Sequence, residues 1–273
     1  MTIIATDLDR TLLPNGKQAY DNSLPIFNKI IKENKFSLIY VTGRYLDQVW
    51  EARNKYQIPI PDHLIALVGT RLYRRQADKL IEDNDWIDEV NSQTKGWDIR
   101  KFQKALSMTE LNIQEPEFQN QLKLSYYLNN TKNHKAVLQE TGDKIKTICP
   151  DAVIIYSVDE TRNLGLLDIL PRAATKLAAL EYLTKKLNLV KEDIVYCGDS
   201  GNDLLPLTHG YRAILVRNTI DEVKVQAQQI TKENGWADKL YIARGLNKLN
   251  GNYVSGIIEG LIKFGIIGEE YSK

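Results

Sequence analysis

Asp7 and Asp9 stand one residue apart near the start of the chain, in the stretch DLDRT that begins at Asp7. They directly follow the apolar residues 2–6, which predict a short buried strand. Carboxylates at a strand end suit phosphoryl transfer, because one can attack phosphorus while the other handles the proton of the leaving oxygen. The same pattern is also typical of a solvated turn in which Thr11 caps a helix. The pair therefore indicates catalysis only if phosphate-binding and metal-binding groups accompany it.

Two later motifs are suited to binding a phosphoryl group. Thr42 and Gly43 follow the apolar residues 36–41 and can offer a hydroxyl and free backbone N–H groups to phosphate oxygens. Lys176 lies near the start of a predicted helix, where the helix dipole disfavours a cation. Taken singly, the first motif also fits a plain strand-to-helix turn, and the second also fits a surface lysine.

The stretch GDSGND, residues 198–203, follows the apolar residues 193–197. It carries Asp199 and Asp203 four residues apart, with Asn202 and two glycines in the same loop. An oxygen-rich, tightly turned loop suits a hard cation such as Mg²⁺, although acidic caps at a helix start would look similar. Together the motifs supply a nucleophile, a proton shuttle, phosphate ligands and a metal site. This combination predicts a phosphoryl-transfer centre.

The elements that must position these groups alternate between strand and helix. Strands are predicted at residues 2–6, 36–41, 64–68, 193–197 and 212–216, and helices at residues 23–34, 45–55, 174–187, 219–229 and 253–264. Continuous apolar runs of this kind are typical of parallel strands buried on both faces. The pattern predicts an α/β fold with a doubly wound, mostly parallel sheet, whose ligands bind beyond the carboxyl ends of the strands.

The middle of the chain reads differently. Residues 122–128, 153–157 and 166–170 alternate in polarity, and an amphipathic stretch covers residues 134–148. Alternation predicts an antiparallel sheet with one exposed face and helices on the other. We therefore expect an inserted, smaller α+β cap domain at residues 76–171, between core segments at residues 1–75 and 172–273.

The amino-acid composition limits the kinds of binding partner that we expect. The 36 Lys and Arg nearly cancel the 35 Asp and Glu, so the formal charge of the 273 residues is +1. Binding to nucleic acid needs a dense positive surface, so we expect no nucleic-acid partner. No apolar run has the length of a membrane span, and charge appears by residue 7 without a leader-like segment. The two cysteines do not form a disulfide framework, so a cytoplasmic location is expected.

These motifs resemble those of the haloacid dehalogenase superfamily, and within it the sucrose-phosphate phosphatase branch. The positions that match the four superfamily motifs are Asp7 with Asp9, Thr42, Lys176, and Asp199 with Asp203. Further stretches that carry the resemblance are VTGR, VGTRLY, LKLSYY, LDILPRAATK, VYCGDSGND and VSGIIEGLIKFG. The resemblance covers essentially the whole chain. It implies a Mg²⁺-dependent phosphatase of a sugar phosphate, with the inserted segment as a cap that selects the leaving group.

The resemblance also implies how the metal and the nucleophile act. Mg²⁺ would be held by the carboxylates of Asp7 and Asp199 and by the backbone carbonyl of Asp9, with Asp203 supporting its waters. Asp7 would attack phosphorus and form an aspartyl-phosphate. Asp9 would give a proton to the departing sugar oxygen and then take one from the hydrolytic water. The residues expected to bind phosphoryl oxygens are Thr42, Gly43, Lys176 and Asn202.

Two positions depart from the branch. Arg10 stands where Gly or Asn is usual, a position expected to tolerate change, and Arg71 stands where an acidic residue is common. We expect Arg71 and Lys123 to touch the sugar, so a guanidinium in place of a carboxylate should alter the preferred substrate. The candidates are sucrose 6-phosphate, mannosyl-fructose phosphate and glycosyl-glycerate phosphates.

Three other functions remain open. A phosphomannomutase-like phosphotransferase would keep Asp7 but pass the phosphoryl group to a second sugar hydroxyl. A catalytically silent sugar-phosphate binding protein would be expected to lack one of the acids, whereas Asp7, Asp9 and Asp199 are all present. A structural or interaction protein has no positive support in the near-neutral composition. A glycosyl-phosphate synthase is a possible partner that delivers the substrate, and the oligomeric state is not indicated.

Overall fold

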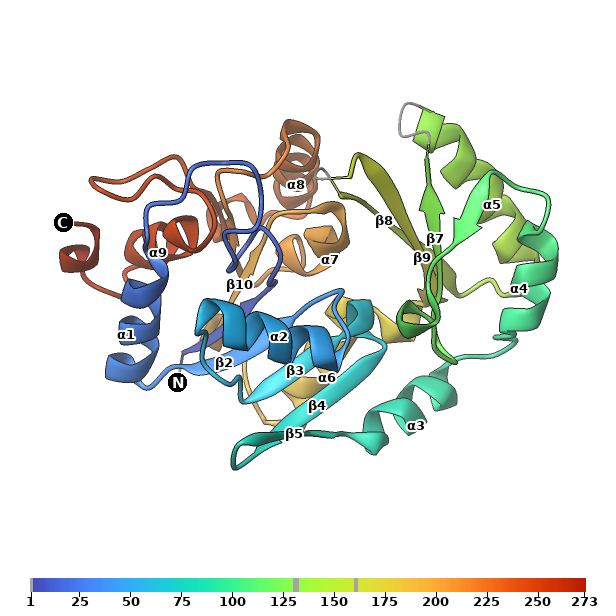
Figure 1. Ribbon diagram of the computed structural model, residues 1–273, viewed down its shortest axis with the longest axis horizontal. Helices are drawn as coiled ribbons and strands as arrows, with labels where there is room; N and C mark the ends of the chain where they lie inside the picture. The colour runs from blue at the N-terminus through green and yellow to red at the C-terminus, as the bar shows by residue number, and fades with distance from the viewer. Residues whose placement is uncertain (1, 130–132, 160–161) are drawn as a thin grey trace.

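Two β-sheets organise the chain in the computed structural model, which describes residues 2–129, 133–159 and 162–273 (Figure 1). The larger sheet has eight strands in the order β12-β11-β10-β1-β2-β3-β4-β5. The strands β12, β11, β10, β1, β2 and β3 run parallel, and the β4–β5 hairpin adds two antiparallel strands at one edge. The bounds of the eight strands are Ile3–Thr6 (β1), Ser37–Val41 (β2), His63–Ala66 (β3), Arg71–Gln76 (β4), Lys79–Glu82 (β5), Ile194–Gly198 (β10), Arg212–Leu215 (β11) and Leu240–Ile242 (β12). The mixed α/β class with a mostly parallel sheet is confirmed.

Strand β1 lies between β10 and β2, with Ile3 paired to both Ile194 and Ser37. The chain runs from β1 to β2 on one side and reaches β10 only much later on the other side. This is the point at which a doubly wound sheet changes direction, and it leaves a crevice beyond the carboxyl ends of the two central strands.

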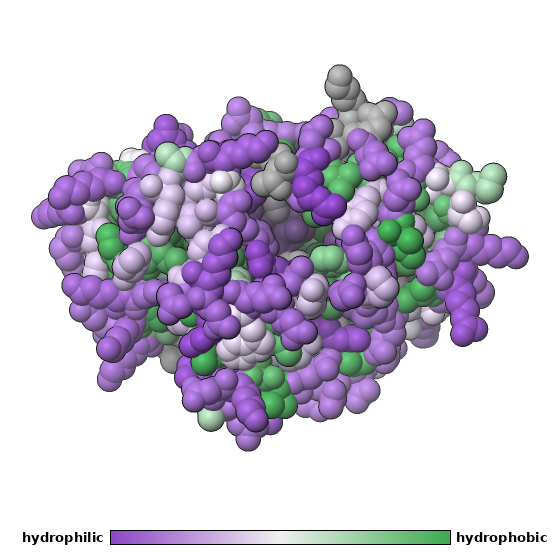
Figure 2. Space-filling view, in the orientation of Figure 1, coloured by the Kyte–Doolittle hydropathy of each residue, from purple (hydrophilic) through white to green (hydrophobic). Residues whose placement is uncertain are grey.

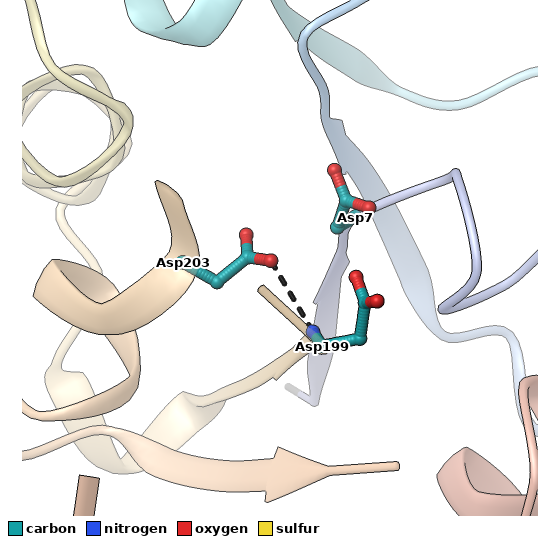
Figure 3. A group of neighbouring side chains, drawn as sticks. All are labelled: Asp7, Asp199 and Asp203. Carbon is teal, nitrogen blue, oxygen red and sulfur yellow. Dashed lines mark hydrogen bonds between the residues drawn. The ribbon is translucent and has the colours of Figure 1, made fainter. Parts of the chain in front are cut away.

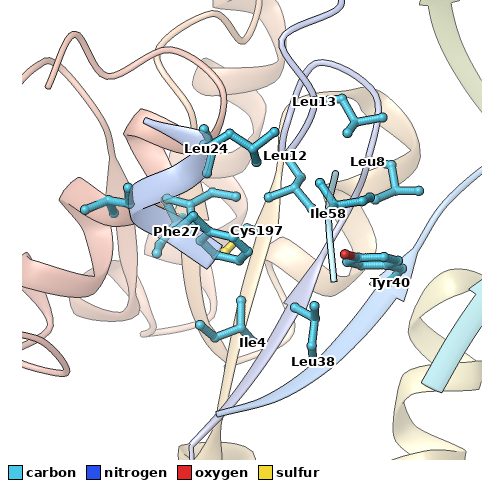
Figure 4. Close-up of a cluster of buried hydrophobic side chains, with 14 of the residues drawn as sticks. Ile4, Leu8, Leu12, Leu13, Leu24, Phe27, Leu38, Tyr40, Ile58 and Cys197 are labelled. Carbon is cyan, nitrogen blue, oxygen red and sulfur yellow. The ribbon is translucent and has the colours of Figure 1, made fainter. Parts of the chain in front are cut away.

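The central strands are buried on both faces, so alternate side chains enter different cores. Ile4 and Tyr40 pack into one hydrophobic cluster (Figure 4), and Ile3 and Ile39 pack into the other. This period of two explains why the strands read as continuous apolar runs. The first cluster also takes side chains from α1 (Leu24–Asn34), α2 (Leu46–Tyr56) and α9 (Val254–Lys263). The second takes them from α3 (Asn84–Gln93), α6 (Lys176–Lys186), α7 (Leu204–Leu207) and α8 (Asp221–Glu233).

The smaller sheet is antiparallel, in the order β6-β7-β9-β8. Its strands are Leu111–Ile113 (β6), Leu124–Leu128 (β7), Ala152–Asp159 (β8) and Leu164–Pro171 (β9), and the helices Ile99–Leu106 (α4) and His134–Ile148 (α5) pack on one face (Figure 1). Phe102 and Ile145 bring the two helices into the same hydrophobic cluster as Leu124 and Leu167. The opposite face of this sheet is turned toward the larger sheet, since Leu166 and Asp168 line the same cavity as Asp7. It thus forms a cap of the expected antiparallel kind.

The larger sheet continues past the boundary at residue 75 that the sequence predicted. Strand β5 pairs with β4, and the following helix α3 packs Trp86 into the second hydrophobic cluster. The Trp86 indole N–H also donates a hydrogen bond to the Gly69 carbonyl at 2.9 Å. The segment up to α3 therefore belongs with the larger sheet rather than with the cap. Among the described residues no helix has both the length and the apolar character needed to cross a membrane.

Candidate active site

Three aspartate side chains meet at the carboxyl ends of β1 and β10 (Figure 3). Asp7 directly follows β1, and its N–H donates to the Cys197 carbonyl at 2.9 Å, which extends the ladder between the strands. Asp199 follows β10, and Asp203 closes the short turn Gly201–Asp203. One oxygen from each carboxylate lies within 4.8 Å of the others, and all three residues are buried. The acids predicted to hold a metal are therefore assembled at the switch point of the sheet.

Asp203 is held by donors on both of its oxygens. Oδ1 accepts hydrogen bonds from Lys176 Nζ at 2.8 Å and from the Tyr196 hydroxyl at 2.6 Å. Oδ2 accepts from the backbone N–H groups of Asp199 and Ser200, both at 3.2 Å. Gly198 is needed beside it, because a Cβ there would lie 2.7 Å from Asp203 Cβ. Asp203 therefore fixes the loop and Lys176, and it has less freedom to ligate a cation directly than Asp7 or Asp199.

Asp199 accepts a hydrogen bond from the Thr11 hydroxyl on Oδ1 at 3.1 Å. Its Oδ2 is buried and accepts no hydrogen bond from the described part of the chain. Burial raises the pKa of Asp199 to about 7, against the opposing effect of the Arg10 charge. Burial also raises the pKa of Asp7, although Lys176 opposes the rise. Clustered buried carboxylates with an uncommitted oxygen fit a hard divalent cation such as Mg²⁺, whose charge would favour their ionised forms.

Lys176 is a buried cation beside Asp7. Its Nζ donates to Asp7 Oδ1 at 2.9 Å, to Asp203 Oδ1 at 2.8 Å and to Asn202 Oδ1 at 2.7 Å. Burial would lower the pKa of Lys176, but the two neighbouring carboxylates raise it above its ordinary value. The side chain can stand at the first turn of α6 because Thr175 caps the helix, accepting from the Ala178 N–H at 3.2 Å. Lys176 is thus placed beside Asp7 as a permanent positive charge.

Thr42 and Gly43 follow β2, the strand beside β1. Thr42 is fully buried, and its hydroxyl accepts from the Arg44 N–H at 3.2 Å. Gly43 lines the crevice, and a Cβ there would meet only Val68 Cγ2, at 3.9 Å. The backbone at Gly43 is therefore open to close approach by a ligand.

Asp9 lies apart from the cluster of the other three acids. Arg44 binds its carboxylate with two hydrogen bonds, Nη2 to Oδ1 at 2.6 Å and Nε to Oδ2 at 2.8 Å, and Asn15 donates to Oδ1 as well. The Asp9 side chain is 41% exposed and lines the cavity. Arg44 was not among the predicted site residues, although it directly follows Thr42 and Gly43 at the strand end.

A cavity of about 390 Å³ separates the acids from the cap. Figure 2 shows a hollow lined with hydrophilic residues between the two parts of the molecule. The cap contributes Lys123 and Asp168, among other residues, to its lining. Lys123 Nζ donates to Asp168 Oδ1 at 2.6 Å, to the Phe118 carbonyl at 3.0 Å and to the Ser125 hydroxyl. The predicted sugar-facing lysine therefore does reach the cavity, with its ammonium already bound by cap groups.

Arg71, which was expected to touch the sugar, lies outside the cavity. Its Nε pairs with Glu82 on β5 at 3.1 Å, and its Nη1 donates to the Thr70 carbonyl at 3.2 Å. The structure therefore gives no support to the expected contact between Arg71 and the sugar, because these contacts hold the side chain on β4 and β5. Residues that line the cavity and were missed include Gln48, Glu51, Gln114, Tyr127, Arg162 and Asp168.

The doubly wound sheet, the inserted cap and the acidic cluster at the switch point define a hydrolase with the haloacid dehalogenase fold. The structure resembles that of the sucrose-phosphatase from Synechocystis solved with sucrose and phosphate, with a TM-score of 0.78 and 24% identity, covering 97% of this chain and 98% of that one. The family model described as sucrose-6F-phosphate phosphohydrolase matches residues 1–265.

Two proteins with similar sequences support the same family. A HAD-like hydrolase of Nitrosococcus oceani is 37% identical over 266 residues, which cover 96% of this chain and 71% of the relative. The mannosylfructose-phosphate phosphatase of Agrobacterium fabrum is 28% identical over 231 residues, 84% of this chain and 88% of the relative. The chain belongs to the sucrose-6F-phosphate phosphohydrolase family. It is a phosphatase, an enzyme that hydrolyses phosphoric monoesters.

Proposed function

We propose that this phosphatase hydrolyses the phosphate ester of a two-sugar or glycosyl-glycerate compound, with Mg²⁺ as cofactor and Asp7 as nucleophile. The observation that carries the proposal is the contact of Lys176 with Asp7, a carboxylate that lines the cavity between the larger sheet and the cap. The named activities of the relatives, sucrose-phosphatase and mannosylfructose-phosphate phosphatase, support a substrate of this class.

The first half of the reaction transfers the phosphoryl group to Asp7. The Asp7 oxygen that is not bound by Lys176 attacks phosphorus, and the bond to the sugar oxygen breaks. Lys176 and the groups at Thr42 and Gly43 bind the phosphoryl oxygens as charge builds on them. Asp7 and Asp199 would hold the metal, with the Asp9 carbonyl as a third ligand. When bound there, Mg²⁺ supplies charge that offsets the repulsion between the nucleophile and the phosphate.

Asp9 moves the protons. It protonates the departing sugar oxygen and later takes a proton from the water that hydrolyses the aspartyl-phosphate, which regenerates Asp7 and releases phosphate. In the structure both Asp9 oxygens accept from Arg44. Oδ2 has a second lone pair that can take a proton, so Arg44 can keep its hydrogen bond and fix the orientation of the carboxyl group during the proton transfers. Arg44 is therefore a positioning residue for the acid–base step.

The cap supplies polar groups for the leaving sugar. One Asp168 oxygen accepts from Lys123 at 2.6 Å and from the Ser125 hydroxyl at 2.6 Å. The carboxylate, which also lines the cavity, is thereby held in one orientation, and its second oxygen can accept a hydrogen bond from a sugar hydroxyl. Buried polar groups of this kind discriminate strongly, because a ligand without the matching hydroxyl leaves them unpaired.

The test is phosphate release with Mg²⁺ from sucrose 6-phosphate, mannosyl-fructose phosphate, glycosyl-glycerate phosphates and simple hexose phosphates. We expect one two-unit phosphate to be strongly preferred, and Asp7→Asn to abolish turnover. Asp78→Asn, the same change at an exposed turn, is the matched control and should leave the rate unchanged. Equal rates on all substrates would contradict the proposed selectivity, and an active Asp7→Asn enzyme would contradict the mechanism.

A further inference from the structure

Arg10 makes specific backbone and side-chain contacts in the candidate active site. Its backbone adopts a left-handed conformation, with φ of 61°, which is uncommon for a residue other than glycine or asparagine. Its N–H donates to Asn15 Oδ1 at 2.8 Å, and its carbonyl accepts from Asn218 Nδ2 at 2.7 Å. Its Nη2 donates to the Asn218 carbonyl at 3.2 Å. Asn218 therefore holds both the backbone and the side chain of Arg10.

The Arg10 guanidinium, which Asn218 holds in place, lies beside the carboxylate of Asp199. Arg10 Nε lies 3.5 Å from Asp199 Oδ2, and the two side chains are 12% and 3% exposed. This is the Asp199 oxygen that accepts no hydrogen bond from the described residues, while Thr11 occupies the other oxygen. Lys176 Nζ is committed to Asp7, Asp203 and Asn202. Arg10 therefore pairs with the Asp199 oxygen that the hydrogen bonds of the described residues leave open to a metal.

We propose that Arg10 competes with the divalent cation for Asp199, so that it weakens metal binding and stabilises the metal-free protein. The inference rests on the proposed metal site of Asp7 and Asp199. A guanidinium at this distance offsets the charge of the buried carboxylate when no cation is bound. It also repels a cation that approaches the same oxygen, and it must yield its ion pair when the cation binds. The guanidinium thus stabilises the metal-free protein but lowers its affinity for the cation. Removing it should therefore lower the melting temperature without metal and tighten metal binding.

Arg10→Asn and Arg10→Gly remove the charge, and both residues accept the left-handed backbone. Arg10→Lys keeps the charge at the same position, and Arg74→Asn, at an exposed position of β4, is the matched control. The measurements are Mn²⁺ binding to the metal-free proteins, followed by the electron paramagnetic resonance signal of free Mn²⁺ and by calorimetry with Mg²⁺, and thermal unfolding in EDTA. None of them depends on turnover.

We expect Arg10→Asn and Arg10→Gly to lower the Kd for Mn²⁺ roughly three- to tenfold, the range of a partly buried ion pair. Their melting temperatures in EDTA should fall by roughly 2–4 °C, while Arg10→Lys and Arg74→Asn stay close to the parent. Unchanged or weaker Mn²⁺ binding in both uncharged variants would overturn the inference. Should one of them fail to fold, the other decides.

Asp199→Asn separates this inference from the proposed function. If it abolishes Mn²⁺ binding while the uncharged Arg10 variants bind like the parent, the metal site stands and the role of Arg10 is refuted. If Asp199→Asn binds Mn²⁺ as tightly as the parent, Asp199 is not a metal ligand, and both the proposed site and the inference are overturned.

Discussion

Replacing Lys176 by Met tests whether the buried ammonium holds the site together. Met has a similar length but no charge, so the change removes the contacts to Asp7 at 2.9 Å and Asp203 at 2.8 Å with little loss of volume. Lys176 is 1% exposed, and both carboxylates are buried as well. Removing one partner of a buried ion pair typically costs about 3–5 kcal/mol, because it leaves an uncompensated charge. We expect the free energy of unfolding in EDTA to fall by that amount.

The assay is urea unfolding of the parent, Lys176→Met, Asp203→Asn and the double variant, all without metal. Because Asp203→Asn removes one of the stranded charges, the double variant should be less destabilised than the two single changes predict, with a coupling of about 1–3 kcal/mol. Lys144→Met, which breaks an exposed pair with Glu140 at 2.7 Å, is the matched control, with an expected loss of at most about 0.5 kcal/mol. A loss below about 1 kcal/mol for Lys176→Met, or additive effects in the double variant, would refute the reasoning.

Four further changes probe other parts of the molecule. Arg44→Lys keeps the charge but loses the two-pronged contact with Asp9, so kcat should fall by roughly tenfold in a steady-state assay, whereas an unchanged kcat would contradict the positioning role. Lys123→Met should raise KM for the preferred sugar phosphate by at least roughly tenfold, since Asp168 loses its cation, and Lys123→Arg should rescue part of the loss. Gly198→Ala should weaken Mn²⁺ binding in a calorimetric titration, because the added Cβ meets Asp203 at 2.7 Å, and normal binding would show that the loop relaxes without cost. Phe27→Ala should lower the free energy of unfolding by about 3–5 kcal/mol in urea while kcat stays unchanged, since Phe27 lies in the hydrophobic cluster of α1 (Figure 4).

The fold was predictable where burial on both faces imposes a continuous apolar pattern. Strand β2, Ser37–Val41, falls within the predicted residues 36–41, and α5, His134–Ile148, has the predicted bounds. The β4–β5 hairpin was not predicted as part of the larger sheet. Its strand Arg71–Gln76 is exposed over its last three residues, so the sequence RLYRRQ carries no apolar run to mark it. Edge strands of this kind are held by backbone pairing, which composition does not encode.

The site was predictable to the extent that its chemistry sits in short contiguous motifs at strand ends. Asp7 and Asp199 meet because the parallel strands β1 and β10 end at one edge of the sheet, and Lys176 reaches Asp7 from the first turn of α6. The pairing of long side chains was not predictable in the same way. Arg44 binds Asp9 and Arg71 binds Glu82, and the choice of partner depends on tertiary distances rather than on spacing along the chain. This is why Arg44 was not predicted as a site residue, and why Arg71 was expected at the sugar although it does not line the cavity.

The arginines also explain how the site balances its charge. The carboxylates of Asp7, Asp9, Asp199 and Asp203 face the cations of Lys176, Arg10 and Arg44. With every group ionised, the centre carries a net negative charge, and it repels a phosphate dianion. A divalent cation reverses that sign, so attraction for the substrate appears only with the metal in place. Arg10 pairs with Asp199 of the proposed metal site, and Arg44 pairs with Asp9, the proposed proton carrier. The metal-free protein can therefore keep the buried carboxylates of Asp7, Asp199 and Asp203 close together, because Lys176 and Arg10 offset their charge.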